Sequence, residues 1–311
     1  MPAVCRLGSV ARGLLFYVRG HSRRGRASAI IRRDDPLRMG APEGRRRRGA
    51  EMMIARLREL YSFRELLWAL VVRELKVKYK NSALGFFWSL LNPVVTMLVF
   101  TFVFSFVFRA GIEHFPLFFL AGMLPWNFFA LSLNRATTSM IENANLIKKV
   151  YFPREVIPLS ILITNLINFG LELVVLFAFL LAWGYFFLPY LPVVLLAAAL
   201  LFLFTGGVAM FLSAAAVYFR DLQQLVPLGV MIWFYGTAVI YPLEFIPASV
   251  RAILMYGNPM NPLISLFRGS LYGLSWPKWH VLVYCAVAAV AAFALGYGLF
   301  ARMARNLAKE V

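Results

Sequence analysis

The chain has 311 residues, of which 61% are hydrophobic and 15% charged, and its formal net charge is +18. A soluble protein carries charge at roughly a quarter of its positions, so the composition argues against a soluble domain and indicates an all-α polytopic membrane protein. The positive charge does not indicate nucleic-acid binding, because the basic residues flank apolar runs, as topology signals do.

The first segment differs from the rest of the chain. Residues 1–52 are rich in Arg, with a run at 45–48, and contain no apolar pattern of useful length. Such a segment buries too little surface to offset its ordering entropy, which predicts a disordered basic extension. The apolar run at 14–18 is too short for a signal peptide. Met52 and Met53 are alternative start sites, and the predicted transmembrane domain covers 53–311.

An amphipathic helix is predicted over 56–72, before the first span. Its apolar side carries Leu60, Phe63, Leu67 and Leu70, at the spacing of one helix face. A basic stretch follows it, formed by Arg73, Lys76, Lys78 and Lys80. A helix of this kind beside a span is expected to lie at the membrane interface, near anionic headgroups.

Uncharged stretches that approach or exceed the 20 residues of one crossing predict six transmembrane helices. These lie at about 86–108, 116–137, 156–183, 193–217, 225–243 and 280–301. Pro189 and Pro192 separate the third from the fourth. Two Asn-Pro pairs, at 258–259 and 261–262, interrupt the apolar segment 248–273, which predicts a re-entrant pair of short external helices.

The basic residues predict the orientation of the chain. They concentrate in segments 1–85, 138–155, 218–224 and 302–311, which lie on one side of a six-span protein. The opposite loops carry Arg109, Arg251, Arg268 and Lys278. Both termini are therefore expected in the cytoplasm.

Common catalytic patterns are missing from the sequence. No phosphate-binding loop of the G-x-x-x-x-G-K-[ST] type occurs, and neither a catalytic site nor a metal site is predicted. The one acidic residue within a predicted span is Glu172. We expect it to be a protonated or hydrogen-bonded carboxyl facing a neighbouring helix, the alternative being a proton or substrate site.

A short cytoplasmic loop at 142–155 is both charged and amphipathic. Leu146, Ile147, Val150 and Tyr151 would share one helical face, a composition suited to docking on a soluble partner. The predicted docking residues are Asn145, Leu146, Ile147, Lys148, Lys149, Val150, Tyr151 and Phe152, with Arg220 and Asp221 from the second cytoplasmic loop.

Aromatic residues within the fifth span are candidates for contact with sugar rings. Trp233, Phe234, Tyr235 and Tyr241 combine ring faces with, in Tyr and Trp, a hydrogen-bonding edge. Most other aromatic residues, such as the Phe-rich run at 100–108, are expected to face lipid or to fill helix contacts.

Several segments resemble one family of membrane transporters. They are LGFFWSLLNP at 84–93, NLIKKVYFP at 145–153, FRDL at 219–222, YPLEFIP at 241–247 and NPMNPL at 258–263. In this order they resemble the polysaccharide and polyol-phosphate export family of ABC-2 type permeases, which includes O-antigen, capsule and teichoic acid exporters. The resemblance covers about 56–311.

The resemblance implies a homodimer joined to two copies of a separate ABC ATPase, which would bind ATP and Mg in place of this chain. It implies that 143–154 is a coupling helix, that the first and fifth spans line a channel, and that 248–273 caps it. Trp88 would then join the aromatic residues of the channel. A lipid-linked glycan would enter at the cytoplasmic leaflet, where Arg73, Lys76, Lys78 and Lys80 attract its pyrophosphate.

Three alternatives stay open at this stage. An ABC-2 permease for a small lipid or drug would share most of these features. A membrane-embedded enzyme of lipid-sugar metabolism would need intramembrane acids or histidines, which are scarce here. A non-catalytic scaffold would have little use for an amphipathic docking loop.

Overall fold

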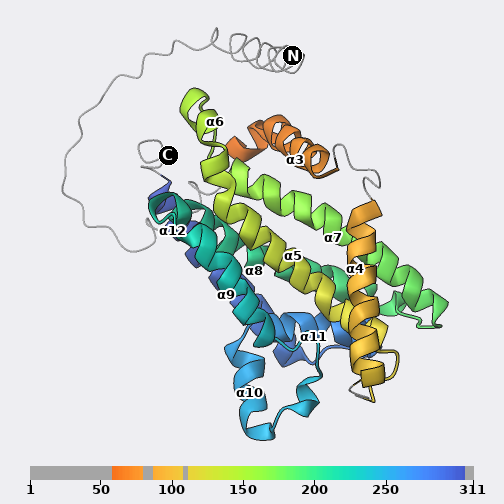
Figure 1. Ribbon diagram of the computed structural model, residues 1–311. Coiled ribbons are helices and arrows are strands. Elements are labelled where there is room, and N and C mark those ends of the chain that lie inside the picture. Colours follow the sequence, from red (N-terminus) through yellow and green to blue (C-terminus); the bar gives the residue numbers. More distant parts are fainter. Residues whose placement is uncertain (1–57, 80–86, 108–110, 305–311) are drawn as a thin grey trace. The chain divides into compact units, whose positions relative to one another are not determined.

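The structure, a computed structural model, describes residues 58–79, 87–107 and 111–304. Regular structure within these ranges is helical, with no strand (Figure 1). The predicted disorder of 1–52 lies outside the described residues. The long helices are α5 (Phe115–Glu142), α7 (Val156–Ala182), α8 (Leu191–Tyr218) and α12 (Trp279–Met303). The shorter ones are α3 (Arg64–Tyr79), α4 (Phe87–Thr101), α6 (Ala144–Lys149), α9 (Leu222–Tyr235), α10 (Ala248–Gly257) and α11 (Met260–Leu271).

Four stretches are long and apolar enough to cross a membrane: Phe115–Glu142, Val156–Ala182, Leu188–Tyr218 and Trp279–Met303. They coincide with the predicted second, third, fourth and sixth spans. The predicted first span corresponds to α4 and the π-helical segment Phe102–Val107 that continues it. Its crossing of the membrane stays a prediction, because the apolar helix there is shorter.

The predicted fifth span is wrong at its C-terminal end, because α9 stops at Tyr235 and does not reach residue 243. Polar side chains of α11 and of Asn258, just before it, form hydrogen bonds with backbone groups of the segment that follows α9. Asn261 Oδ1 accepts from Ala238 N–H at 2.7 Å, and Asn258 Nδ2 donates to the Gly236 carbonyl at 3.0 Å. Arg268 donates to the Ala238 and Val239 carbonyls at 2.8 and 2.7 Å. A non-helical backbone is stable in such a place because its polar groups are paired.

We call Asn258, Asn261 and Arg268 the backbone clamp. The Arg268 guanidinium also lies over the Phe118 ring of α5, 3.7 Å from its centroid. The clamp therefore holds α11, the turn after α9 and the start of α5 together.

Two short helices, α10 and α11, meet at the step from Asn258 to Pro259, as the first Asn-Pro pair predicts. The second pair, Asn261 and Pro262, does not interrupt the helix. Pro262 lies in the first turn of α11, where a missing N–H leaves no helical hydrogen bond unmade. The depth of this helix pair in a membrane stays a prediction.

Helices α7 and α8 pack against α5, which is mostly buried, whereas α12 packs against α8 and most of it is not buried. The pair α8 and α12 makes the most extensive contact. Their backbones approach so closely that a Cβ on Gly296 would overlap the Gly207 carbonyl. Small residues permit such approach, which is how membrane helices gain packing energy without a hydrophobic driving force.

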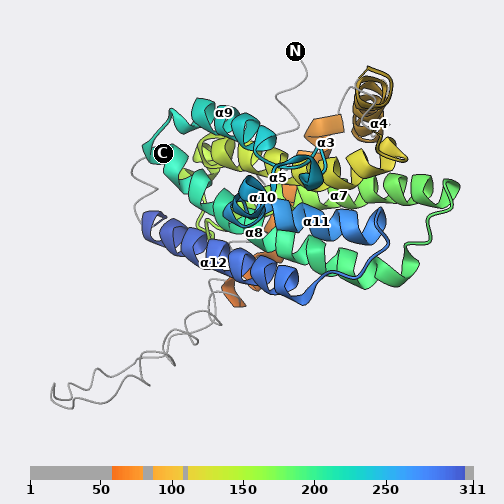
Figure 2. The same ribbon diagram turned by 90° about the horizontal axis from the view of Figure 1, so that it is seen from below.

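Helices α3 and α6 lie at one end of the long helices, and α10 and α11 lie at the other (Figure 1). The view from below looks onto α10 and α11 (Figure 2). At the first end, a small apolar cluster joins α3, α5, α6, α7, α8 and α12. The apolar side predicted for 56–72 faces it: Leu70 is buried, and Leu60, Phe63 and Leu67 pack against the cluster. The helix differs from the prediction in its limits, because a turn at Phe63 interrupts it and α3 runs on to Tyr79.

Candidate coupling site

Asn143 separates α5 from α6. Its backbone N–H donates to the Ser139 carbonyl at 3.2 Å, and its side-chain amide donates to the same carbonyl at 2.8 Å, which closes the last turn of α5. Its own carbonyl accepts from Leu146 N–H at 3.0 Å and Ile147 N–H at 3.1 Å, which opens α6. The position of this residue therefore sets where α6 begins.

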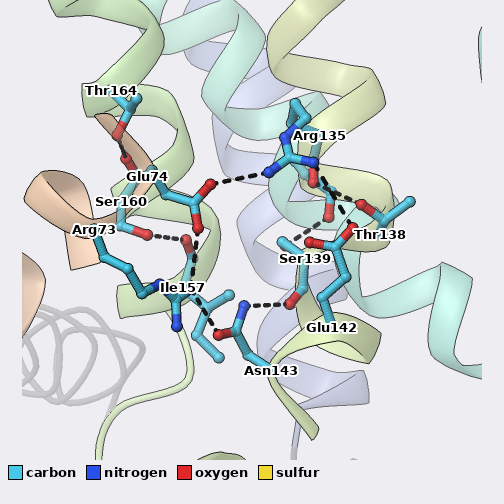
Figure 3. A network of polar contacts seen from close by, with 11 residues as sticks. Arg73, Glu74, Arg135, Thr138, Ser139, Glu142, Asn143, Ile157, Ser160 and Thr164 are labelled. Carbon is cyan, nitrogen blue, oxygen red and sulfur yellow. Dashed lines mark hydrogen bonds and ion pairs between the residues drawn. The ribbon is translucent and has the colours of Figure 1, made fainter. Parts of the chain in front are cut away.

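A polar network ties α3 to this junction (Figure 3). Arg73 Nη2 donates to Asn143 Oδ1 at 2.9 Å and to Glu74 Oε1 at 3.0 Å. The second oxygen of Glu74 accepts from Arg135 Nη2 at 2.9 Å, and Arg135 Nη1 lies 3.8 Å from Glu142 Oε1. We call Arg73, Glu74, Arg135, Glu142 and Asn143 the polar joint. It connects the middle of α3 to the last two turns of α5 and to the start of α6.

Water reaches the charged groups of the joint unevenly. The Glu74 side chain is 12% exposed, whereas those of Arg73 and Arg135 are each 47% exposed. An acceptor held between two guanidinium groups at the protein surface forms a small ion-pair network, in which charges can exchange partners more readily than in an interior.

The basic residues predicted at the substrate entry do not gather on one surface. Arg73 belongs to the polar joint, and Lys80 lies outside the described residues. Lys76 and Lys78 are both exposed on α3. Because α3 is helical through both positions, residues two apart point to different sides. Arg73 and Lys76, three apart, share a side.

The predicted docking loop contains a real helix, α6, but not the predicted single face. Ile147 and Phe152 are buried in the small apolar cluster, and Leu146 and Val150 pack against it. Tyr151 is 84% exposed instead, because α6 ends at Lys149 and Val150 is extended, with φ −130° and ψ 135°. The polar positions Asn145, Lys148 and Lys149 are exposed.

An open groove of about 530 Å³ is lined by this segment. Its lining residues come from the start of the described chain, from 147–155 and from α12: Glu59, Ile147, Lys148, Lys149, Val150, Tyr151, Phe152, Pro153, Arg154, Glu155, Ala301 and Ala304. Glu155 is buried at its base and accepts from the Tyr297 hydroxyl of α12 at 3.5 Å. Charges of both signs beside apolar side chains favour a protein partner over a small apolar ligand.

The second predicted loop lies at the same end. Arg220 and Asp221 are exposed between α8 and α9. Tyr218, just before them, packs against the small apolar cluster and donates to the Met303 carbonyl at 2.9 Å. Both predicted docking loops therefore rest on one cluster.

The aromatic residues predicted to line a channel differ in their contacts and in their exposure. Trp233 donates to Asn258 Oδ1 at 2.8 Å and meets the Phe129 ring edge to face at 5.0 Å, so it contacts α5 and the backbone clamp. Phe234 lies against Trp126 at 5.5 Å. Tyr235 is the exposed one of the three aromatic residues of α9, and its carbonyl accepts from the Tyr241 hydroxyl at 3.0 Å. The side chain of Trp88, on α4, lies outside the described residues.

Sequence reasoning missed the polar joint and the backbone clamp. The partners in the joint are separated by 61 and 70 positions in the chain, and no local pattern connects them. One signal was present, since Arg135 sits just inside a long apolar stretch, where an unpaired cation is costly. Among the described residues, no group of three or more His, Cys, Asp or Glu could hold a metal ion.

Comparison with known proteins places these features in a family. The model of the ABC-2 type transporter family matches residues 65–272, more than half of the chain. The chain belongs to this family. It is accordingly a multi-pass membrane protein, and its match begins within α3 and ends just after α11.

Individual relatives are transport proteins. The chain is 36% identical over 262 residues, 83% of its length and 100% of the relative's, to the O-antigen export system permease protein RfbA of Myxococcus xanthus. It is 35% identical over 208 residues, 66% of its length and 79% of the relative's, to the RfbA permease of Klebsiella pneumoniae. A more distant relative is the polysialic acid transport protein KpsM of Escherichia coli, 23% identical over 64% of this chain and 78% of the relative.

Proposed function

We propose that the chain is the permease subunit of an ATP-driven exporter that moves a lipid-linked polysaccharide from the cytoplasmic to the external side of a bacterial plasma membrane. The observation that carries the proposal is the 36% identity over the full length of an O-antigen export permease. Similarity to a polysialic acid transport protein, which is named for a different glycan, also supports a polysaccharide substrate.

The proposed topology has six spans. Besides the four long helices, α4 with its π-helical continuation forms the first span and α9 with the following turn forms the fifth. Helix α9 has 14 residues, which cover about 21 Å of a core about 30 Å thick, so the clamped turn must supply the remaining depth. Helices α10 and α11 would then dip into the external leaflet without crossing. The uneven distribution of basic residues supports a cytoplasmic position for both termini.

The proposed assembly is a homodimer with two ABC ATPase subunits. Helices α4 and α9 both expose large apolar side chains, which suits contact with lipid or with a second copy. These include Leu91, Val95 and Leu98 of α4, Phe102 of the π-helical segment that continues it, and Leu225, Leu228, Met231, Ile232 and Tyr235 of α9. ATP and Mg would bind to the ATPase, because this chain carries no phosphate loop.

The ATPase would dock on α6, Tyr151 and the groove beside them. Support comes from the exposed Tyr151, the cationic pair Lys148 and Lys149, and the position of α6 at the end of the central helix α5. A push on α6 would reach α5 through Asn143 and the small apolar cluster.

Gene deletion in the native host tests the transport proposal. Loss of the chain should remove a surface polysaccharide and accumulate its lipid-linked form inside the cell, and the wild-type gene should restore both. Unchanged surface glycan together with no internal lipid-linked intermediate would contradict the proposal.

A separate experiment tests the docking surface. The combined change Lys148→Glu, Lys149→Glu and Tyr151→Ala should release the ATPase during co-purification and abolish export. Lys278→Glu, a charge reversal of the residue that precedes α12 at the opposite end, is the matched control and should retain the ATPase. Full retention of the ATPase by the triple variant would place docking elsewhere.

A further inference from the structure

The polar joint fixes α3 in two directions at once. Arg73 and Glu74 are neighbours in sequence, so their side chains leave the helix about 100° apart. One reaches Asn143 and the other reaches Arg135, at 2.9 Å in both cases. Contacts in two directions hold both the position of α3 and its rotation about its own axis.

A movement of α3 would therefore reach α6. Asn143 receives the Arg73 hydrogen bond on its side chain, and its main chain opens α6 through Leu146 and Ile147. Glu74 reaches the same region by a second route, through Arg135 and Glu142 at the end of α5. Helix α3, beside the predicted substrate entry, and helix α6, beside the predicted ATPase site, are thus connected by polar and charged side chains.

Arg73 is also placed to meet an anionic ligand. Its side chain is 47% exposed, and the exposed Lys76 lies on the same side of α3, one turn further on. A guanidinium has five N–H donors in a planar fork that matches phosphate oxygens. The Nη2 of Arg73 serves both Glu74 and Asn143. A phosphate that turned this guanidinium toward Lys76 would therefore weaken at least one of these bonds.

We infer that Arg73 is a substrate sensor: a phosphate or pyrophosphate headgroup bound between Arg73 and Lys76 releases Asn143, loosens the start of α6 and stimulates the docked ATPase. Glu74 and Arg135 are positioning residues that keep α3 in register while Arg73 changes partner. This inference rests on the proposed function, since it assigns roles to residues between the substrate entry and the ATPase.

The test uses the complete transporter, permease with ATPase, in nanodiscs of zwitterionic lipid. Undecaprenyl pyrophosphate is the probe, and both its binding and its stimulation of ATP hydrolysis are measured. Wild type should be stimulated. Arg73→Gln should bind the probe about tenfold more weakly, the loss of one charge-assisted hydrogen bond at a partly exposed site, and should lose stimulation.

Asn143→Ala separates sensing from binding. It removes the oxygen that receives Arg73 but leaves the charges of α3 in place. The probe should therefore still bind, while the basal rate of ATP hydrolysis should rise and the probe should stimulate it no further. A purely structural role would lower both together. Glu65→Gln is the matched control, an exposed carboxylate of α3 outside the joint, and should behave as wild type.

Charge reversal gives a second, independent readout. Glu74→Arg and Arg135→Glu should each abolish stimulation. The two together should restore it in part, because the pair is re-formed with exchanged signs while like charges now meet at Arg73 and at Glu142. A double variant that stays as defective as the single ones would overturn the positioning role. The sensor proposal would be overturned if Arg73→Gln and Asn143→Ala kept wild-type stimulation.

The source of the anion is tested by adding phosphatidylglycerol to the nanodiscs in place of the probe. Phosphatidylglycerol should stimulate less than undecaprenyl pyrophosphate does, and equal stimulation would overturn the assignment to the substrate. Failure of the sensor is distinguishable from failure of the proposed function, because export by the wild type is measured separately. An exporting wild type with normally stimulated variants would refute the sensor alone.

Discussion

The two ends of this molecule are held by different kinds of contact. The backbone clamp uses two amides and one guanidinium to pair backbone groups of the turn after α9. The polar joint connects side chains to one another, four of them charged and one, Asn143, a neutral amide, and both of its arginines are about half exposed. In the clamp, Asn261 is buried and its hydrogen-bond partners are backbone groups that have few alternatives.

This difference determines which end can change. A buried amide that loses its backbone partner leaves two polar groups unpaired, and few waters are near to replace them. A half-exposed arginine can exchange a carboxylate for water or for phosphate at little cost. We conclude that the clamp preserves a non-helical backbone, while the joint is able to rearrange. Three predictions test this contrast, in order of expected effect on stability.

The largest effect is expected from Gly122→Ala. A Cβ at this position would overlap Arg268 Nη2 and lie 3.3 Å from the Val239 carbonyl, so the guanidinium would have to leave its place. Overpacking and two broken hydrogen bonds together should cost about 3 kcal/mol of unfolding free energy. The measurement is thermal unfolding of the purified permease, followed by tryptophan fluorescence.

Gly170→Ala on α7 provides the matched control. A Cβ there meets nothing within 4 Å, and alanine is the better helix former, so the midpoint should stay level or rise slightly. Equal loss of stability in both variants would mean that the clamp is not what makes Gly122 sensitive.

A smaller effect is expected from Asn261→Ala. This change removes the acceptor for Ala238 N–H at 2.7 Å and the donor to the Leu254 carbonyl at 2.7 Å. Two buried backbone groups lose their partners, which should cost about 2 kcal/mol. Asn145→Ala, at an exposed site of α6, should stay within about 0.5 kcal/mol of wild type. A tolerated Asn261→Ala would remove the argument that the clamp is rigid.

Much of this architecture follows from local pattern. The four long spans are visible because an uncharged stretch is a property of consecutive residues, and the helix pair at α10 and α11 follows from an Asn-Pro step. The end of α9 was misjudged because the residues that stop it, Asn258, Asn261 and Arg268, lie further along the chain. The uncharged residues at 237–240 are read as a continued span unless the partners of their backbone groups are known.

The candidate site shows the same limit. Composition marked 142–155 as a docking loop, and α6 lies there, but Tyr151 was assigned to a face that ends before it. The polar joint depends on α3 lying beside the end of α5, which is a tertiary fact. Sequence therefore located the segments of the site, whereas their connection required the structure.

The smallest effect on stability is expected from Glu74→Gln, although its effect on coupling should be large. Glu74 joins two arginines that are each 47% exposed, and pairs of this kind contribute less than about 1 kcal/mol. At about 1 M salt, where the Debye length is about 3 Å, the difference from wild type should shrink further. The stability of Asn261→Ala relative to wild type should not depend on salt, since its partners are neutral. If Glu74→Gln destabilised the protein as much as Gly122→Ala does, both ends would be rigid. The joint would then be a structural brace, and α3 would have no freedom to report a bound headgroup to α6.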